Sequence, residues 1–122
     1  KANPNDPVLT LAYAKVLTAL KDPAALTMAE RAYKLAPGNT PIADGYGWAL
    51  IQSGSLEAGV RILREARLRE PGNALVRWHL AAGLAKAGKK QEAREELQAA
   101  LAASPPPAPQ PELNQLKVEL GL

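Results

Sequence analysis

The sequence contains no cysteine and no phenylalanine, and only one histidine. Without cysteine there is no disulfide, no thiolate metal site and no thiol catalysis. No apolar run approaches the roughly 18 to 20 residues that a membrane-spanning helix needs, and no charged start leads into a short apolar stretch as in a secretory signal. Only five valines and three isoleucines supply β-branched apolar side chains, so strands lack their usual material. These absences predict an all-helical chain without membrane insertion.

The charges are balanced and scattered. The chain has 15 Lys and Arg against 12 Asp and Glu, a net charge of +3, with no basic block. The cations of Arg61 and Arg64 alternate with the anions of Glu57 and Glu65, which is typical of a solvated helix face. Nucleic-acid binding usually concentrates positive charge on one face, so we expect no nucleic-acid partner.

Length and composition indicate one small domain. The 122 residues are 47% apolar and 22% charged, which suits a single globular unit. Because the chain begins with lysine instead of methionine, we expect it to be the C-terminal part of a longer protein.

An internal repeat runs through most of the chain. Pro37, Pro71 and Pro105 are each separated by 34 residues. Short repeats of this kind predict a solenoid, because no single repeat can bury its own apolar face. The same spacing relates two sets of small residues: Ala32, Ala66 and Ala100, and Ala25, Gly59 and Ala93.

Each repeat divides into two helices. Thr40 before Pro41 resembles a capping side chain before a proline in the first helical turn, and glycine-containing turns separate the apolar-periodic stretches. Short turns between helices make neighbouring helices antiparallel. The small residues then allow the helix axes to approach closely. The predicted helices span 7–20, 23–36, 41–53, 56–70, 74–87 and 90–103.

A proline-rich stretch follows Ser104 and cannot be helical. Beyond it Leu113, Leu116 and Leu120 recur at helical spacing. Residues 112–120 are therefore predicted to form a short amphipathic helix that covers the last repeat. A frayed tail and a helix that docks on another subunit are the alternatives.

The repeat resembles the tetratricopeptide repeat (TPR) family. The family pattern is matched by Tyr46-Gly47, Leu50, Gly59, Leu63, Ala66 and Pro71, and again by Leu80-Ala81, Leu84, Ala93, Leu97, Ala100 and Pro105. The resemblance implies an all-α, right-handed superhelical solenoid of three helix-turn-helix repeats at about 6–39, 40–73 and 74–107. We place these repeats in residues 1–107, and the end of the proline-rich linker with the short capping helix in residues 108–122.

A narrower likeness concerns compartment. The stretch 47–50 and the run 78–101 resemble the C-terminal repeats of bacterial envelope-associated members of this family, including lipoproteins tied to exopolysaccharide and exosortase systems. This likeness implies a bacterial protein that is cytoplasmic, periplasmic or associated with the envelope.

Candidate binding residues lie on the first helix of each repeat. A helical position two residues from a core position is rotated by about 200° and is expected to point outward. The family resemblance adds that first helices line a concave face that binds peptides. Trp48 and Trp78 either pack together between repeats or anchor a ligand side chain. The groove candidates are Lys15, Asp44, Trp48, Gln52, Trp78, His79 and Lys86.

The sequence does not predict an enzyme. A lone His79 without cysteine or a nearby acidic cluster is a poor metal ligand, and neither a serine-histidine-acid arrangement nor a phosphate-binding glycine loop is indicated. We expect no cofactor and no metal. The leading hypothesis is a non-catalytic protein-protein interaction module that binds a peptide or partner helix in the concave groove. The alternative is a structural end segment of a longer array, or a homodimerisation element.

Overall fold

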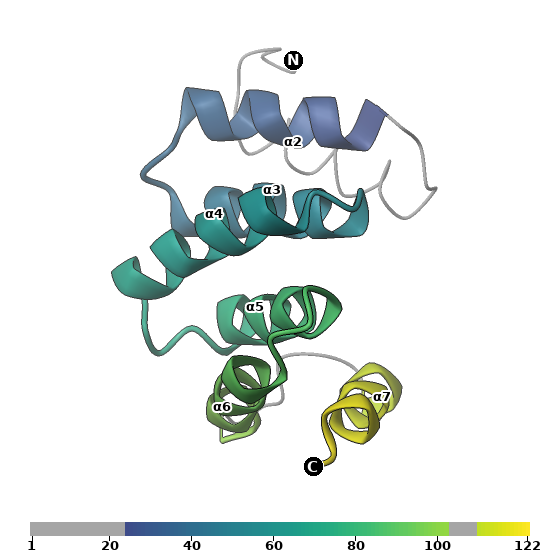
Figure 1. Ribbon diagram of the computed structural model, residues 1–122. Coiled ribbons are helices and arrows are strands. Elements are labelled where there is room, and N and C mark those ends of the chain that lie inside the picture. The colour runs from purple at the N-terminus through teal and green to yellow at the C-terminus, as the bar shows by residue number, and fades with distance from the viewer. Residues whose placement is uncertain (1–23, 103–109) are drawn as a thin grey trace.

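The computed structural model describes residues 24–102 and 110–122 (Figure 1). Within these ranges every regular element is an α-helix. The helices agree with the predicted spans to within two residues, whereas the predicted helix 7–20 lies outside the described residues, as does Lys15. The helices are α2 (Ala24–Leu35), α3 (Thr40–Gln52), α4 (Leu56–Arg69), α5 (Ala74–Lys86), α6 (Lys90–Leu101) and α7 (Gln110–Leu120).

Asparagine side chains begin the first helix of two successive repeats. The side-chain oxygen of Asn39 accepts a hydrogen bond from the Ile42 amide at 3.1 Å, and that of Asn73 accepts one from the Val76 amide at 3.2 Å. The prediction that Thr40 caps its helix was wrong, because Asn39 occupies the cap and Thr40 is already a buried helical residue. The two caps are 34 residues apart and start α3 and α5 identically.

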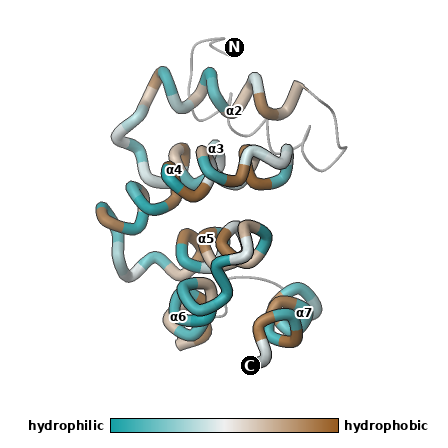
Figure 2. Tube along the Cα trace, viewed as in Figure 1, coloured by the Kyte–Doolittle hydropathy of each residue, from teal (hydrophilic) through white to brown (hydrophobic). Residues whose placement is uncertain are grey.

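The helices stack as antiparallel hairpins. Within the hairpins, α3 packs against α4 and α5 packs against α6 (Figure 1). Successive repeats are joined by the packing of α2 against α3 and of α4 against α5. Figure 2 shows hydrophobic and hydrophilic stretches alternating along these helices, as expected where each helix buries one side. The described helices therefore form an all-α repeat solenoid, as predicted. Its largest fully buried side chains are Ile42, Ile51, Leu63, Val76, Leu80, Leu84, Leu97, Leu113 and Leu120.

Glycines at the hairpin contacts let the backbones approach. A Cβ atom added to Gly59 would lie 2.9 Å from the Gly47 carbonyl oxygen and 2.7 Å from the δ-methyl of Ile51. Real Cβ atoms do not approach other atoms so closely, so α3 and α4 could not take their present separation with larger residues here. The predicted role of small residues in close helix packing is confirmed at these positions.

Helix α7 covers the last hairpin. Leu113, Leu116 and Leu120 are buried, and α7 packs against α5 and α6 (Figure 1). The Arg94 Nε atom donates a hydrogen bond to the Leu120 carbonyl oxygen at 2.5 Å, which holds the end of α7 on α6. The predicted capping helix is therefore present.

Candidate functional site

Two neighbouring first helices, α3 and α5, bring four predicted site residues together. The Trp48 and Trp78 ring centroids are 5.3 Å apart. The His79 ring stacks on Trp48 at a centroid distance of 4.2 Å and lies 4.8 Å from Trp78. Its Nδ1 atom is hydrogen-bonded to the Asp44 carboxylate at 2.8 and 3.0 Å. The result is a compact aromatic cluster that joins one repeat to the next.

The structure corrects the placement of Asp44 and His79. Both were expected to line an open groove, but Asp44 is 4% and His79 7% exposed. The reason is that α3 is enclosed by α2, α4 and α5, so that it buries residues around most of its circumference. Trp48 and Trp78 pack against each other across repeats, and both remain partly exposed.

The face of α5 that carries Trp78 forms an apolar stripe. Leu75, Trp78, Ala82 and Ala85 recur at helical spacing, and none is fully buried. Leu75 is 40% exposed. The indole N–H of Trp78 is buried without a hydrogen-bond partner, which costs free energy unless something accepts it. The periodicity of α5 was sufficient to include Leu75, which the sequence interpretation omitted.

Polar candidates lie where the two first helices end. Gln52 is the last residue of α3 and Lys86 is the last residue of α5, 34 residues further on, and both are exposed as predicted. Lys86 takes part in none of the ion pairs formed among the described residues. It supplies a cation at one end of the apolar stripe.

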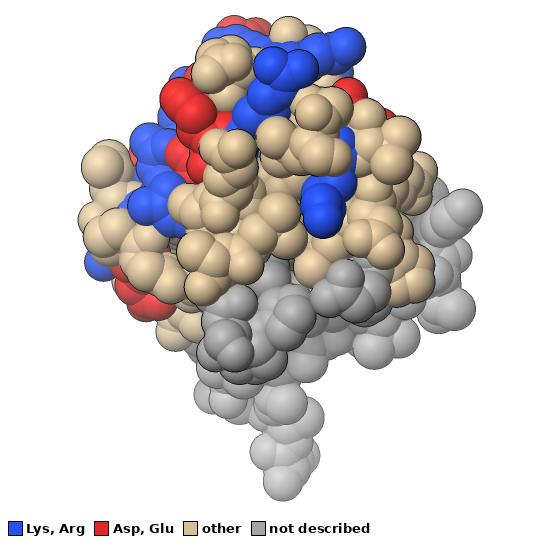
Figure 3. All heavy atoms as spheres, turned by 90° about the horizontal axis from the view of Figure 1, so that it is seen from below, with Lys and Arg blue, Asp and Glu red and all other residues tan. Residues whose placement is uncertain are grey.

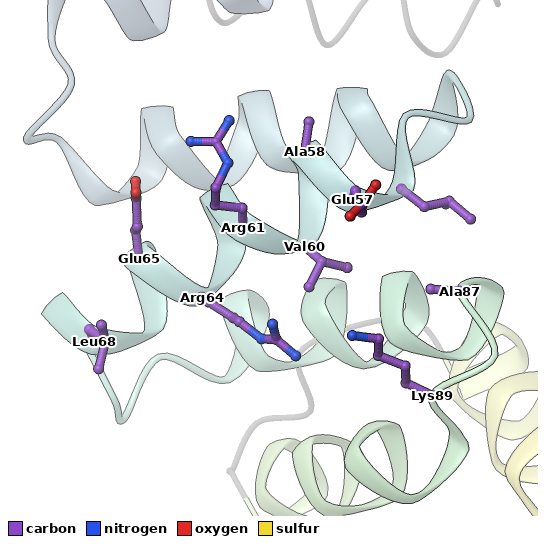
Figure 4. A pocket seen from close by; sticks show the side chains of 10 residues that line it. Glu57, Ala58, Val60, Arg61, Arg64, Glu65, Leu68, Ala87 and Lys89 are labelled. Carbon is purple, nitrogen blue, oxygen red and sulfur yellow. The ribbon is translucent and has the colours of Figure 1, made fainter.

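A hollow lies on the outer side of α4 and was not predicted from the sequence. It encloses about 620 Å³ and opens between α4 and the turn before α6 (Figure 4). Val60 contributes to its floor, and Arg64 and Lys89 extend into it from opposite sides. Its lining comprises Leu56, Glu57, Ala58, Val60, Arg61, Arg64, Glu65, Leu68, Ala87 and Lys89.

Charged side chains alternate in sign on the surface. On the face shown in Figure 3, basic and acidic side chains lie next to one another. The most buried of the described carboxylates in an ion pair with arginine is Glu96, which binds Arg67 and, at 2.9 Å, Arg77. This triad ties α6 to α4 and α5. It is a structural link between hairpins.

One tyrosine hydroxyl has a shifted acidity. Burial raises the pKa of Tyr46, and the neighbouring Glu30 carboxylate raises it further. The Tyr46 ring lies 5.1 Å from that of Tyr33, so the pair joins α2 to α3. A raised pKa keeps the Tyr46 hydroxyl protonated at neutral pH.

The part of the chain that the structure describes has neither a cluster of metal-ligating side chains nor a helix able to span a membrane. Residues 24–102 and 110–122 hold no group of three or more histidine and acidic side chains placed to bind a metal ion. None of the helices in these ranges has the length and apolar character needed to cross a bilayer.

Solved structures share the fold. YrrB, described as "a TPR protein with an unusual peptide-binding site", superposes with a TM-score of 0.76 at 22% identity, over 96% of this chain and 58% of YrrB. MamA AMB-1 superposes with TM-scores of 0.70 and 0.72 in two structures, at 21% and 20% identity, over 94% and 99% of this chain and 65% and 73% of MamA. The chain thus spans about three fifths of the length of YrrB.

A match to a protein-family model shows which family this chain belongs to. No curated protein sequence matches this chain significantly. The tetratricopeptide repeat model matches residues 50–119, more than half of the chain. The fold is that of a protein-protein interaction module, and the chain belongs to the tetratricopeptide repeat family.

Proposed function

We propose that this chain is a non-catalytic module that binds a segment of another protein along the inner face of α3 and α5. The observation that carries the proposal is the partly exposed apolar stripe of α5, with Trp78 at its centre and Trp48 beside it. An apolar strip of this kind on a rigid repeat scaffold is suited to a helix or an extended peptide.

The stripe also defines the chemistry of the partner. Leu75 is 40% exposed and offers apolar contact area at the start of the stripe. The exposed ammonium group of Lys86 stands at its other end, with Gln52 at the end of the neighbouring helix. A segment with two or three apolar side chains, followed by a carboxylate near Lys86, is complementary to this surface.

The unpaired indole N–H gives a reason for binding here. Trp78 Nε1 is buried without a partner. A bound segment whose backbone carbonyl reaches this N–H would satisfy it. Tryptophan is also enriched among residues that dominate binding energy. The description of YrrB as a TPR protein with an unusual peptide-binding site is consistent with peptide binding on such a scaffold.

Selection of a displayed random-peptide library on the immobilised chain tests the proposal. We expect enriched peptides to bind with dissociation constants in the micromolar range, about −8 kcal/mol, and to shift the tryptophan fluorescence. Leu75→Glu is expected to weaken their binding at least tenfold, because it places a charge in the stripe.

Leu35→Glu is the matched control. Leu35 is 43% exposed, close to the 40% of Leu75, but lies at the end of α2 away from the stripe. Enriched peptides should bind this variant as tightly as the unaltered chain. Peptides that bind Leu75→Glu equally well would place binding elsewhere and contradict the proposal.

The alternative function is structural. The stacking of Trp48, His79 and Trp78 between repeats favours it, because such packing stiffens an array without any ligand. In that case the library selection would enrich no peptide that depends on Leu75, and replacing the tryptophans would lower stability alone.

A further inference from the structure

A buried polar pair, Asp44 with His79, joins α3 to α5 beside the two tryptophans. Asp44 is 4% and His79 7% exposed, so neither side chain offers appreciable area to a bound segment. The His79 ring nevertheless contacts both Trp48 and Trp78, at centroid distances of 4.2 and 4.8 Å. Both tryptophans remain partly exposed. Any effect of this pair on a ligand must therefore pass through the tryptophans.

Asp44 sets the orientation of the His79 ring. The Nδ1 atom lies 2.8 and 3.0 Å from the two carboxylate oxygens. A carboxylate accepts hydrogen bonds and does not donate them, so Nδ1 carries the hydrogen and the ring cannot turn over without losing the bond. Because Asp44 belongs to α3 and His79 to α5, the hydrogen bond also fixes the ring relative to the neighbouring repeat.

The oriented imidazole in turn restrains Trp48. The planes of the two rings differ by only 18°, so the imidazole covers one face of the indole. The Trp78 ring lies 5.3 Å from Trp48 at an interplanar angle of 38°. Packed aromatic rings favour particular mutual geometries. An indole that is already held in place loses little conformational entropy when a ligand covers it, and this strengthens binding.

Stability alone gives no reason for a polar pair at this position. Replacing a buried, hydrogen-bonded polar pair by apolar side chains of similar size is often neutral or stabilising. A neighbouring contact between the same two helices is apolar, since the Ile51 side chain of α3 lies against Gly83 of α5. Asp44 and His79 supply a fixed ring direction, which an apolar pair would not.

We propose that Asp44 and His79 are positioning residues of the binding surface. Asp44 orients His79, and His79 holds Trp48 and Trp78 in the arrangement that a bound segment contacts. This inference rests on the proposed function and gives the two buried residues a role in binding without contact with the ligand. Loosening the pair should then weaken binding even where the chain stays folded.

Peptides that are enriched on the unaltered 122-residue chain and lose affinity for Leu75→Glu are the probes. Asp44→Ala removes the hydrogen-bond acceptor of His79 and should weaken their binding by about fivefold or more, because the freed rings must be ordered on binding. In Asp44→Asn the amide still pairs with Nδ1, which should restore the affinity to within about twofold of the unaltered chain. Near-ultraviolet circular dichroism of the free chains reports fixed aromatic packing. Its signal should fall in Asp44→Ala and recover in Asp44→Asn.

Two further variants separate positioning from stability. Ile62→Ala truncates a buried side chain of α4 in an apolar cluster separate from the one that Trp48 and Trp78 contact. It should lower the melting temperature and leave the peptide affinity unchanged when all chains are compared below their unfolding transitions. The double variant Asp44→Leu/His79→Leu keeps the site filled, so it should remain folded and still bind the peptides about fivefold or more weakly.

Several results would overturn the positioning role while the peptides still depend on Leu75, and would leave the proposed function intact. They are an Asp44→Ala or double variant that binds as the unaltered chain does, an Asp44→Asn variant as weak as Asp44→Ala, and an Ile62→Ala variant that weakens binding equally. An Asp44→Ala variant with an unchanged near-ultraviolet signal would overturn it without any ligand. If no peptide depends on Leu75, the proposed function fails and the positioning role fails with it.

Discussion

Replacing Gly83 by alanine should destabilise the stack, although alanine is the better helix former. Ile51 of α3 reaches across to α5, and a Cβ atom added to Gly83 would lie 2.6 Å from its δ-methyl and 3.1 Å from its Cγ1. The Ile51 side chain cannot retreat freely, because Gly59 faces the same δ-methyl so closely that a Cβ there would lie 2.7 Å from it. Ile51 is 1% exposed and is held between two glycines of successive repeats.

Two opposing effects set the change in the free energy of unfolding that Gly83→Ala causes. Alanine in place of glycine in a helix interior contributes about 1 kcal/mol of stability. An extra methyl group in a close-packed core costs about 1 to 3 kcal/mol. Because Ile51 is restrained by Gly59 on its other side, we place the cost at the upper end. The net destabilisation is about 1 to 2 kcal/mol, or roughly 4 to 8 °C in melting temperature.

Urea denaturation followed by circular dichroism measures this change, and a second substitution tests its cause. Ile51→Val alone should cost about 1 kcal/mol. In that background Gly83→Ala should cost little or become stabilising, since the δ-methyl is gone, which gives a coupling of at least about 1 kcal/mol. Gly72→Ala is the control, because a Cβ there meets no atom within 4 Å. A Gly83→Ala variant as stable as the unaltered chain, or one that shows no coupling to Ile51, would refute this reasoning.

Four further substitutions test other parts of the stack. Glu96→Gln should lower the free energy of unfolding, measured by urea denaturation, by about 2 kcal/mol, because it removes a buried charge shared by two arginines. Glu92→Gln breaks a more exposed ion pair and should lower it by less than about 1 kcal/mol. Asn73→Ala should lower stability by about 1 kcal/mol by removing the cap of α5, and an unchanged midpoint would show that water replaces it. Trp48→Phe should shift the fluorescence of the remaining Trp78 to longer wavelength, because the smaller phenyl ring covers less of Trp78 than the indole whose centroid lies 5.3 Å away. Unchanged emission would contradict this packing.

Most of the fold was predictable because the repeat is regular. The 34-residue spacing of Pro37 and Pro71 defines the helix pairs, and glycine turns end the first helices at Gly54 and Gly88, where φ is +93° and +82°. Positive φ values of this kind favour glycine strongly. The spacing of Leu113 and Leu116 was likewise enough to predict the cap. These features are local, and a single chain segment determines each of them.

Contacts between repeats were not predictable from spacing alone. The triad of Glu96 with Arg67 and Arg77 joins three helices. From the sequence alone, each of these residues is predicted to be a charged side chain on a solvated helix face. The α4 hollow likewise depends on contacts between repeats. Its lining combines residues of α4 with Ala87 and Lys89 of the turn before α6, and the sequence does not give the distance between these elements. Side chains from separate repeats meet only when the stacking geometry is known.

The burial of Asp44 and His79 shows that a predicted outward direction on one helix does not guarantee exposure to solvent. Such a prediction treats a helix as having one buried side, so that a residue two positions from Tyr46 must face water. Helix α3 has neighbours on several sides, and its buried residues include Ile42, Asp44 and Ile51, which point in different directions. A carboxylate and an imidazole can be buried here because they hydrogen-bond to each other at 2.8 Å. In an interior repeat, therefore, a polar residue on a first helix marks a ligand surface only if the first helix of the next repeat places no hydrogen-bond partner within its reach, as His79 lies within reach of Asp44.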